Sequence, residues 1–190
     1  MEQHKQNRQY FHGSSVSGLQ ELKPQVSEHG MPLVYLTSNP VVAALYTVRP
    51  VEKPFSWYPY SFSGTTPVYT EYYPDALRDI YCGKMGYIYR SRCEVELSLD
   101  DPTSVGCALV SRKPVTVDGY TCLADVYEAL LEYERAGKLI IKRYETLTEK
   151  QRGLFEKMLT EEIQKHKLKE TDCDYGRFLQ ERFADVWENA

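Results

Sequence analysis

A histidine, a glycine and two tyrosines have the types and the spacing to form a pocket for a flat ligand that carries an amide. His12 and Gly13 follow one short apolar run, and Tyr35 lies in a second, Leu33 to Leu36. Tyr46 lies 11 residues after Tyr35. Phenol rings combine a large apolar face with a hydroxyl group, which suits the stacking of planar ligands. We interpret these residues as candidates for one binding pocket.

Short strands and one short helix must position these side chains. A strand is expected over residues 9 to 12, and the compact apolar run Leu33 to Leu36 predicts a second strand. Asn39 is a plausible N-cap and Pro40 suits the first helical position, so a helix is expected from Pro40 to Tyr46.

The rest of the chain predicts an α+β protein with a helical C-terminal part. Strands are expected near residues 68–73, 86–97, 107–111, 114–117 and 139–144, and helices over 74–82 and before Gly137. Thr148 and Gln151 match a capping box, and further apolar spacing predicts helices after Thr148 and over 176–187. We therefore expect a flexible N-terminus over residues 1–9, a domain over 10–146 and a helical hairpin over 147–190 packed on it.

Composition narrows the function classes. The formal net charge is −4, from 23 Lys and Arg against 27 Asp and Glu, which gives no general electrostatic case for binding nucleic acid or an anionic membrane. The five cysteines form no CxxC pair and no histidine has partners at metal spacing, so neither a disulfide framework nor a metal site is expected. No segment is apolar enough to suggest a membrane span, and a cytoplasmic protein is expected.

These motifs, in this order, resemble the ADP-ribosyltransferase superfamily of the His-Tyr type. The resemblance implies split mixed and antiparallel β-sheets with flanking helices, and NAD as a substrate. It assigns His12 to the adenine-side ribose of NAD, the main chain of Gly13 to the nicotinamide amide, and Tyr35 and Tyr46 to the two faces of the nicotinamide ring. Ser14 and Thr37 complete the expected binding set, although Ser14 and Ser15 are equally suited to capping a turn.

A second group of motifs resembles the small bacterial rifamycin ADP-ribosyltransferases. These motifs are Gly86-Tyr87-Ile88-Tyr89, Leu99-Asp100-Asp101-Pro102 and Ser111-Arg112-Lys113-Pro114. With His12 and Tyr35, the resemblance implies Asp101 as the third catalytic residue. Glu94, Glu96 and Glu128 are rival carboxylates. The chain departs from those enzymes in an aromatic insertion over residues 50–73 and in its C-terminal helices, so rifamycin is not implied as the acceptor.

The sequence favours one function and leaves three alternatives open. The favoured function is that of an NAD-dependent transferase that moves ADP-ribose to an unknown acceptor, which is a protein, a nucleic acid or a small molecule. A nearby carboxylate suits this reaction, because breaking the nicotinamide–ribose bond develops positive charge on the ribose. The alternatives are a non-catalytic ADP-ribose or nucleotide-binding domain, a protein-interaction domain, or an enzyme of the RNA 2′-phosphotransferase type.

Overall fold

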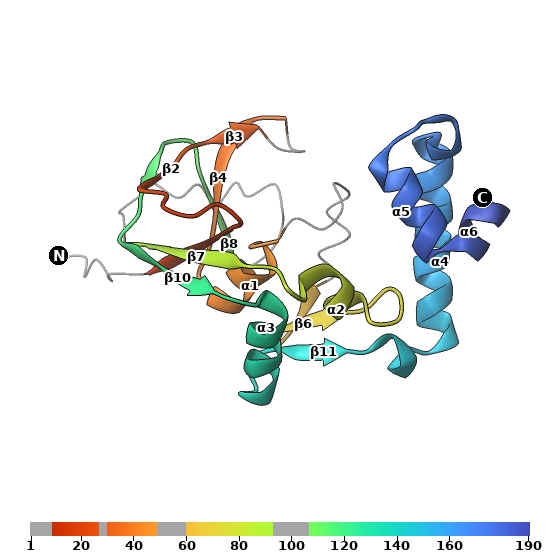
Figure 1. The fold of residues 1–190 in the computed structure, drawn as a ribbon, viewed down its shortest axis with the longest axis horizontal. Helices are drawn as coiled ribbons and strands as arrows, with labels where there is room; N and C mark the ends of the chain where they lie inside the picture. The colour runs from red at the N-terminus through yellow and green to blue at the C-terminus, as the bar shows by residue number, and fades with distance from the viewer. Residues whose placement is uncertain (1–8, 27–29, 49–59, 93–106) are drawn as a thin grey trace, which may run out of the picture. The chain divides into compact units, whose positions relative to one another are not determined.

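The structure is a computed structural model that describes residues 9–26, 30–48, 60–92 and 107–190 (Figure 1). It is an α+β protein with antiparallel and mixed sheets, which confirms the expected class. The chain forms two compact units, one from Met1–Val48 and Gly83–Leu131, the other from Arg49–Cys82 and Glu132–Ala190. In the part of the chain that is described, no helix is long and apolar enough to cross a membrane.

The first unit is built on a six-stranded sheet in the order β10-β7-β1-β4-β3, with β8 also paired to β4. Its strands are β1 (Tyr10–Ser14), β3 (Gln25–Val26), β4 (Pro32–Thr37), β7 (Gly86–Ser91), β8 (Ala108–Ser111) and β10 (Gly119–Leu123). Two further strands, β2 (Glu21–Leu22) and β9 (Val115–Thr116), form an antiparallel pair. One buried cluster joins this pair to the sheet and contains Leu22, Val34, Leu36, Tyr89 and Val115.

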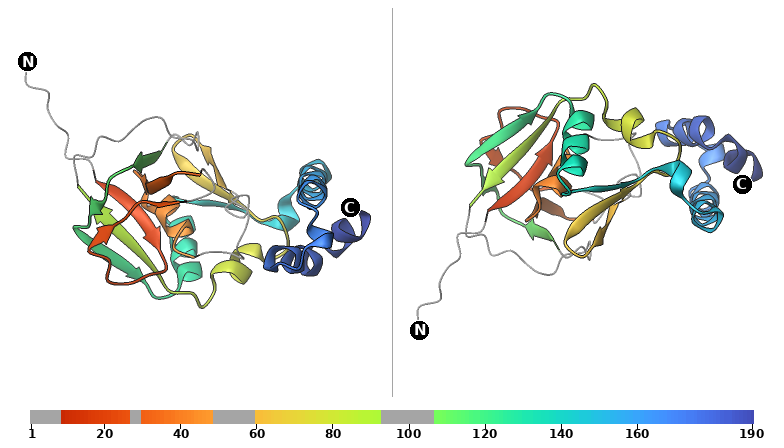
Figure 2. Two further views of the ribbon diagram at one scale, coloured as in Figure 1. Left: turned by 90° about the horizontal axis from the view of Figure 1, so that it is seen from above. Right: turned by 90° about the horizontal axis from the view of Figure 1, so that it is seen from below.

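Helix α1 (Pro40–Leu45) packs on strands β1, β4 and β7, as Figures 1 and 2 show. Its N-cap is Asn39, whose side chain accepts a hydrogen bond from the Val41 N–H at 2.9 Å, and Pro40 opens the helix. This confirms the expected start of the helix. The residues from Val41 to Leu45 are all buried, so α1 is held by packing although it is short.

Helix α3 (Val126–Arg135) begins at a side-chain cap that the sequence did not reveal. The Asp125 carboxylate accepts hydrogen bonds from the Glu128 N–H at 3.3 Å and from the Gly83 N–H at 2.9 Å. One of these donors belongs to the first turn of the helix, and the other lies 42 residues earlier in the chain. Asp125 therefore fixes the start of α3 against the segment that leads into β7.

The second unit contains a three-stranded mixed sheet and most of the helices. Strand β6 (Thr66–Thr70) pairs antiparallel with β5 (Tyr60–Ser63) and parallel with β11 (Ile140–Lys142). Its helices are α2 (Ala76–Tyr81), η2 (Tyr144–Thr146), α4 (Glu149–Lys165), η3 (Leu168–Glu170), α5 (Asp174–Arg182) and α6 (Ala184–Asn189). Thr148 and Gln151 form the expected capping box of α4. The helix expected over 176–187 is interrupted at Phe183, where φ is −136° and ψ is 49°.

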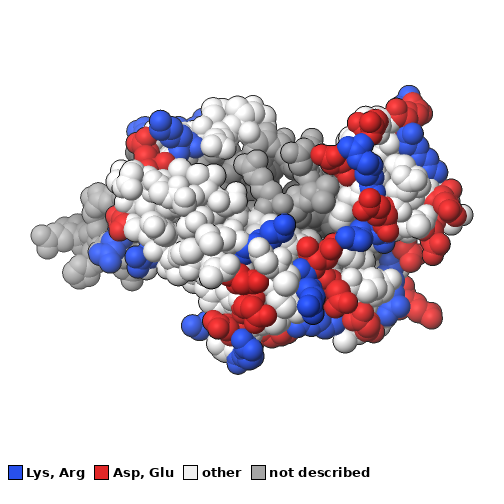
Figure 3. Space-filling model, viewed as in Figure 1, with Lys and Arg blue, Asp and Glu red and all other residues white. Residues whose placement is uncertain are grey.

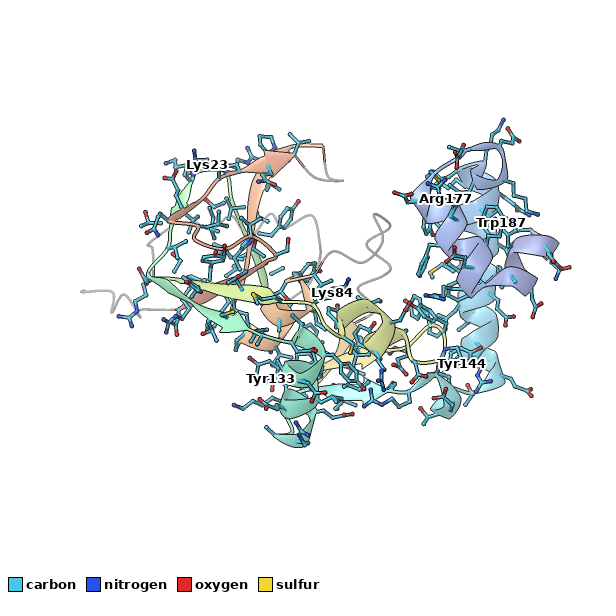
Figure 4. All side chains as sticks on the ribbon, in the orientation of Figure 1. Lys23, Lys84, Tyr133, Tyr144, Arg177 and Trp187 are labelled. Atoms are coloured by element: carbon cyan, nitrogen blue, oxygen red, sulfur yellow. The ribbon has the colours of Figure 1, made fainter. Side chains whose placement is uncertain are left out.

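Helices α4, α5 and α6 pack on residues that precede and begin α2. The shared buried cluster consists of Tyr73, Ala76, Leu159, Ile163, Leu168, Tyr175, Phe178 and Leu179, with Trp187 (labelled in Figure 4) packed against it. On the face drawn in Figure 3, positive and negative side chains are interspersed over these helices. No large field of one sign covers them on that face.

A buried carboxylate connects three elements of the second unit. Glu71 is 3% exposed, and its two oxygens accept hydrogen bonds from the Leu77 N–H at 3.0 Å and the Tyr144 N–H at 3.2 Å. The guanidinium of Arg152 donates to the Tyr144 carbonyl at 3.3 Å and lies over the Tyr144 ring. Tyr144, labelled in Figure 4 between β11 and α4, is therefore held at both its N–H and its C=O.

We expect Glu71→Gln to destabilise the protein by about 2 kcal/mol, because the amide NH₂ group of glutamine cannot accept from a main-chain N–H. One of the two buried N–H groups would then face another donor. Glu145→Gln, an equivalent change at an exposed residue of η2, is the control and should change the unfolding free energy little. Urea denaturation measures both variants. A Glu71→Gln protein as stable as the control would contradict this role.

Candidate functional site

The sheet of the first unit opens between strands β1 and β4. Strand β1 pairs with β7 over its full length, from Tyr10 to Ser14, but with β4 only at Phe11 and Thr37. Thr37 also pairs with Ala108 of β8, so β8 occupies the opposite edge of β4. Within the described residues, the facing edges of β1 and β4 therefore have no pairing after Phe11. If the register continued, Gly13 would lie opposite Tyr35.

The ring of His12 bridges this opening. Its Nδ1 lies 2.8 Å from the carbonyl oxygen of Tyr35. A carbonyl only accepts hydrogen bonds, so Nδ1 carries the proton and donates. Burial lowers the pKa of His12 below its ordinary value of 6.5, and the bond to the Tyr35 carbonyl opposes this shift as the smaller effect. The imidazole is therefore neutral near pH 7, and its Nε2 is an acceptor.

Gly13 allows the main chain of helix α1 to approach β1. A Cβ atom at Gly13 would lie 2.0 Å from the carbonyl oxygen of Ala43 and 2.9 Å from the carbonyl carbon of Tyr46. That Ala43 oxygen accepts the N–H of Tyr46 at 3.1 Å, at the C-terminal end of the helix. Only glycine fits at this position, and the close contact brings Tyr46 beside Gly13.

The four predicted pocket residues thus lie together in the first unit. His12 and Gly13 are neighbours on β1, Tyr35 is joined to His12 by the hydrogen bond, and Tyr46 lies against Gly13 through its main chain. The side chain of Tyr46 is 41% exposed and that of Tyr35 is half-buried. One ring is therefore accessible to a ligand at the surface, and the other is partly covered.

Two predicted binding residues form turns. The Ser14 hydroxyl accepts the Val16 N–H at 3.1 Å, which is the turn-capping alternative that the sequence left open for this residue. The buried Thr37 hydroxyl accepts the Asn39 N–H at 3.0 Å. Both hydroxyls keep their own proton as a donor. These hydrogen bonds stabilise the turns that follow β1 and β4.

Three of the four candidate carboxylates, Asp101, Glu94 and Glu96, lie outside the described residues. Glu128 is described, and it is exposed in the first turn of α3.

The first turn of α3 packs near the end of α1. A Cβ atom at Gly86 would lie 2.4 Å from the Cβ of Thr47 and 3.0 Å from a methyl group of Val126. Thr47 follows Tyr46 directly, and Val126 opens the helix that carries Glu128. This turn of α3 is therefore part of the same packed region as the end of α1.

The described residues were also compared with two other kinds of site, a metal-binding group and a surface hollow. Across the described ranges, no group of three or more His, Cys, Asp and Glu side chains is arranged to hold a metal ion. A hollow of about 440 Å³ lies in the second unit, and its lining contains none of the predicted site residues. It is lined by Tyr73, Pro74, Asp75, Arg78, Asp79, Cys82 and Arg182.

No family model matches the sequence, and neither a curated protein nor a solved structure matches it. The interpretation of the site therefore depends on the motifs and on the geometry described above.

Tyr89 is a residue of this region whose role the sequence did not reveal. It lies on β7 directly opposite His12, and its hydroxyl contacts the main chain of the loop that follows β1. Tyr87, Tyr89 and Tyr120 form a group of neighbouring rings with centroids 5.6 to 6.4 Å apart. The alternation of Tyr87 and Tyr89 was visible in the sequence and indicated one face of a strand, but not its partner.

We expect Gly13→Ala to destabilise the protein by about 3 kcal/mol or more, since the new methyl group would overlap a main-chain carbonyl that cannot move without displacing α1. Gly153→Ala is the matched control. Gly153 lies within α4 with open space around its position, so alanine there should be neutral or stabilise by up to about 1 kcal/mol. Thermal denaturation separates the two. Equal stability of Gly13→Ala and the wild type would refute the close approach.

Proposed function

We propose that the first unit binds NAD at the opening between β1 and β4, and that the protein is an ADP-ribosyltransferase-like enzyme of the corresponding fold. The observation that carries this proposal is the hydrogen bond from His12 to the Tyr35 carbonyl, together with the main-chain contact of Tyr46 with the neighbouring Gly13. These contacts involve the four residues, His12, Gly13, Tyr35 and Tyr46, that the resemblance assigns to NAD.

The strand edge supports recognition of the nicotinamide amide. A primary carboxamide offers one acceptor and two donors, and an unpaired strand edge offers N–H and C=O groups side by side. The edge of β1 after Phe11 is such a surface, because β4 has departed from it. Glycine at position 13 lets α1 lie directly against this part of β1. The tyrosines then supply aromatic faces for the pyridinium ring.

The tautomer of His12 supports recognition of a sugar. With Nδ1 donating to the Tyr35 carbonyl, the unprotonated Nε2 accepts a hydrogen bond from a hydroxyl group. A ribose hydroxyl is the donor that NAD would present there. The same nitrogen would reject a ligand that offers only acceptors.

The reaction proposed is a displacement at C1′ of the nicotinamide ribose. The bond from C1′ to the pyridinium nitrogen breaks, and this nitrogen keeps the electron pair and leaves as neutral nicotinamide. A lone pair of the acceptor forms the new bond to C1′, and the acceptor loses a proton. A carboxylate stabilises the positive charge on the ribose, and Asp101 is proposed for this role, with Glu94, Glu96 and Glu128 as rivals. The acceptor is a protein, a nucleic acid or a small molecule.

A pair of His12 variants tests the proposed site. His12→Asn places an amide near the position of Nδ1, so it keeps a donor for the Tyr35 carbonyl and removes the Nε2 acceptor. His12→Gln places an oxygen near the position of Nε2 and removes the Nδ1 donor. We expect His12→Asn to weaken NAD binding about tenfold, the loss of one hydrogen bond. His12→Gln should bind better than His12→Asn but unfold more easily.

Calorimetry measures NAD binding, and chromatography of released nicotinamide separates an enzyme from a nucleotide-binding protein. Binding without nicotinamide release would favour the non-catalytic alternative. A wild-type protein that does not bind NAD, or a His12→Asn variant with unchanged affinity, would overturn the proposed site.

A further inference from the structure

Tyr89 is almost completely buried beside the candidate site. It is 1% exposed, and on β7 it lies directly opposite His12 of β1. Side chains of directly opposed residues in antiparallel strands extend to the same face of the sheet, with Cβ atoms about 5 Å apart. The phenol of Tyr89 and the imidazole of His12 are therefore neighbours on one face.

The hydroxyl of Tyr89 holds the loop that leaves β1. It donates to the carbonyl of Val16 at 2.7 Å and accepts the N–H of Leu19 at 3.2 Å. The N–H of Val16 is held in turn by the hydroxyl of Ser14 at 3.1 Å. Val16 is thus fixed at both its N–H and its C=O, so the loop has a defined shape although it has no regular secondary structure.

This loop presents hydrogen-bond donors to solvent. Ser15, Ser17 and Gly18 are exposed, and the chain from Ser14 to Leu19 contains no acidic side chain. The hydroxyls of Ser15 and Ser17 and the N–H groups of Ser17 and Gly18 make no hydrogen bond to any described residue. Gly18 has a φ of 73°, which a residue with a side chain rarely adopts. Phosphate oxygens accept hydrogen bonds from main-chain N–H groups and from hydroxyls.

We infer that Tyr89 is a positioning residue, and that it holds the Ser15–Gly18 loop as a binding surface for the pyrophosphate of the dinucleotide. This inference depends on the proposed NAD site. A ribose whose hydroxyl lies on Nε2 of His12 carries a phosphate on the same sugar. The loop begins three residues after His12, about 10 Å along an extended strand, and Tyr89 of the neighbouring strand anchors it. It therefore lies within reach of that phosphate.

Two ligands and one matched control variant test this role. NAD and nicotinamide riboside share the nicotinamide and its ribose, but the riboside lacks both the pyrophosphate and the adenosine. Tyr89→Phe removes only the hydroxyl, and Tyr120→Phe makes the same change at the exposed tyrosine opposite Tyr89 on β10. We expect Tyr89→Phe to weaken NAD binding about fivefold and to change riboside binding less than twofold. Tyr120→Phe should change neither.

The combined variant Ser15→Ala and Ser17→Ala gives an independent result, because both residues are exposed and their loss does not threaten folding. It should also weaken NAD binding and leave riboside binding unchanged, and it decides the question if Tyr89→Phe does not fold. Equal losses for both ligands, or no loss for NAD, would overturn the role of the loop. If the wild type binds neither ligand, the proposed NAD site itself fails.

Discussion

The hydrogen bond between the His12 ring and the Tyr35 carbonyl is the interaction on which the site depends. Where β1 and β4 separate, their facing main-chain groups lose strand partners, and an unsatisfied buried carbonyl costs about 1–3 kcal/mol. At this point the imidazole of His12 donates a hydrogen bond to the Tyr35 carbonyl. The same bond selects one tautomer of His12, so the group that keeps the opening in place also gains a defined acceptor for a ligand.

The second constraint is steric and acts through the main chain. Helix α1 lies so close to β1 that only glycine fits at position 13, and the helix ends at Tyr46 beside that glycine. The place of Tyr46 is therefore set by main-chain contact. The main-chain position of Tyr46 is pre-organised, because it does not depend on the rotamer of a side chain. The main chain of the loop after β1 is likewise fixed, by the hydroxyl of Tyr89.

The features that the sequence predicted correctly are those encoded within a few residues. Asn39 and Pro40 start α1, and Thr148 and Gln151 form the capping box of α4, because cap chemistry is local. The hydrogen bond between His12 and Tyr35 joins residues 23 positions apart, and only the resemblance led us to expect these two residues in one pocket. The bonds from Gly83 to Asp125 and from Tyr144 to Glu71, and the contacts of the Tyr89 hydroxyl, were missed, since each joins residues far apart in the chain. The interruption at Phe183 was also missed, because apolar spacing continues across it.

The state of the His12 ring is the most direct test of the account. Long-range ¹H–¹⁵N NMR of the imidazole, recorded across a pH titration, reports both the tautomer and the pKa. We predict a neutral ring protonated at Nδ1, a pKa below 6.5, and an Nε2 signal that shifts when NAD is added. A ring protonated at Nε2 would contradict the hydrogen bond to Tyr35, a pKa above 6.5 would contradict the burial of the ring, and an Nε2 signal that NAD does not shift would contradict the ligand-binding role.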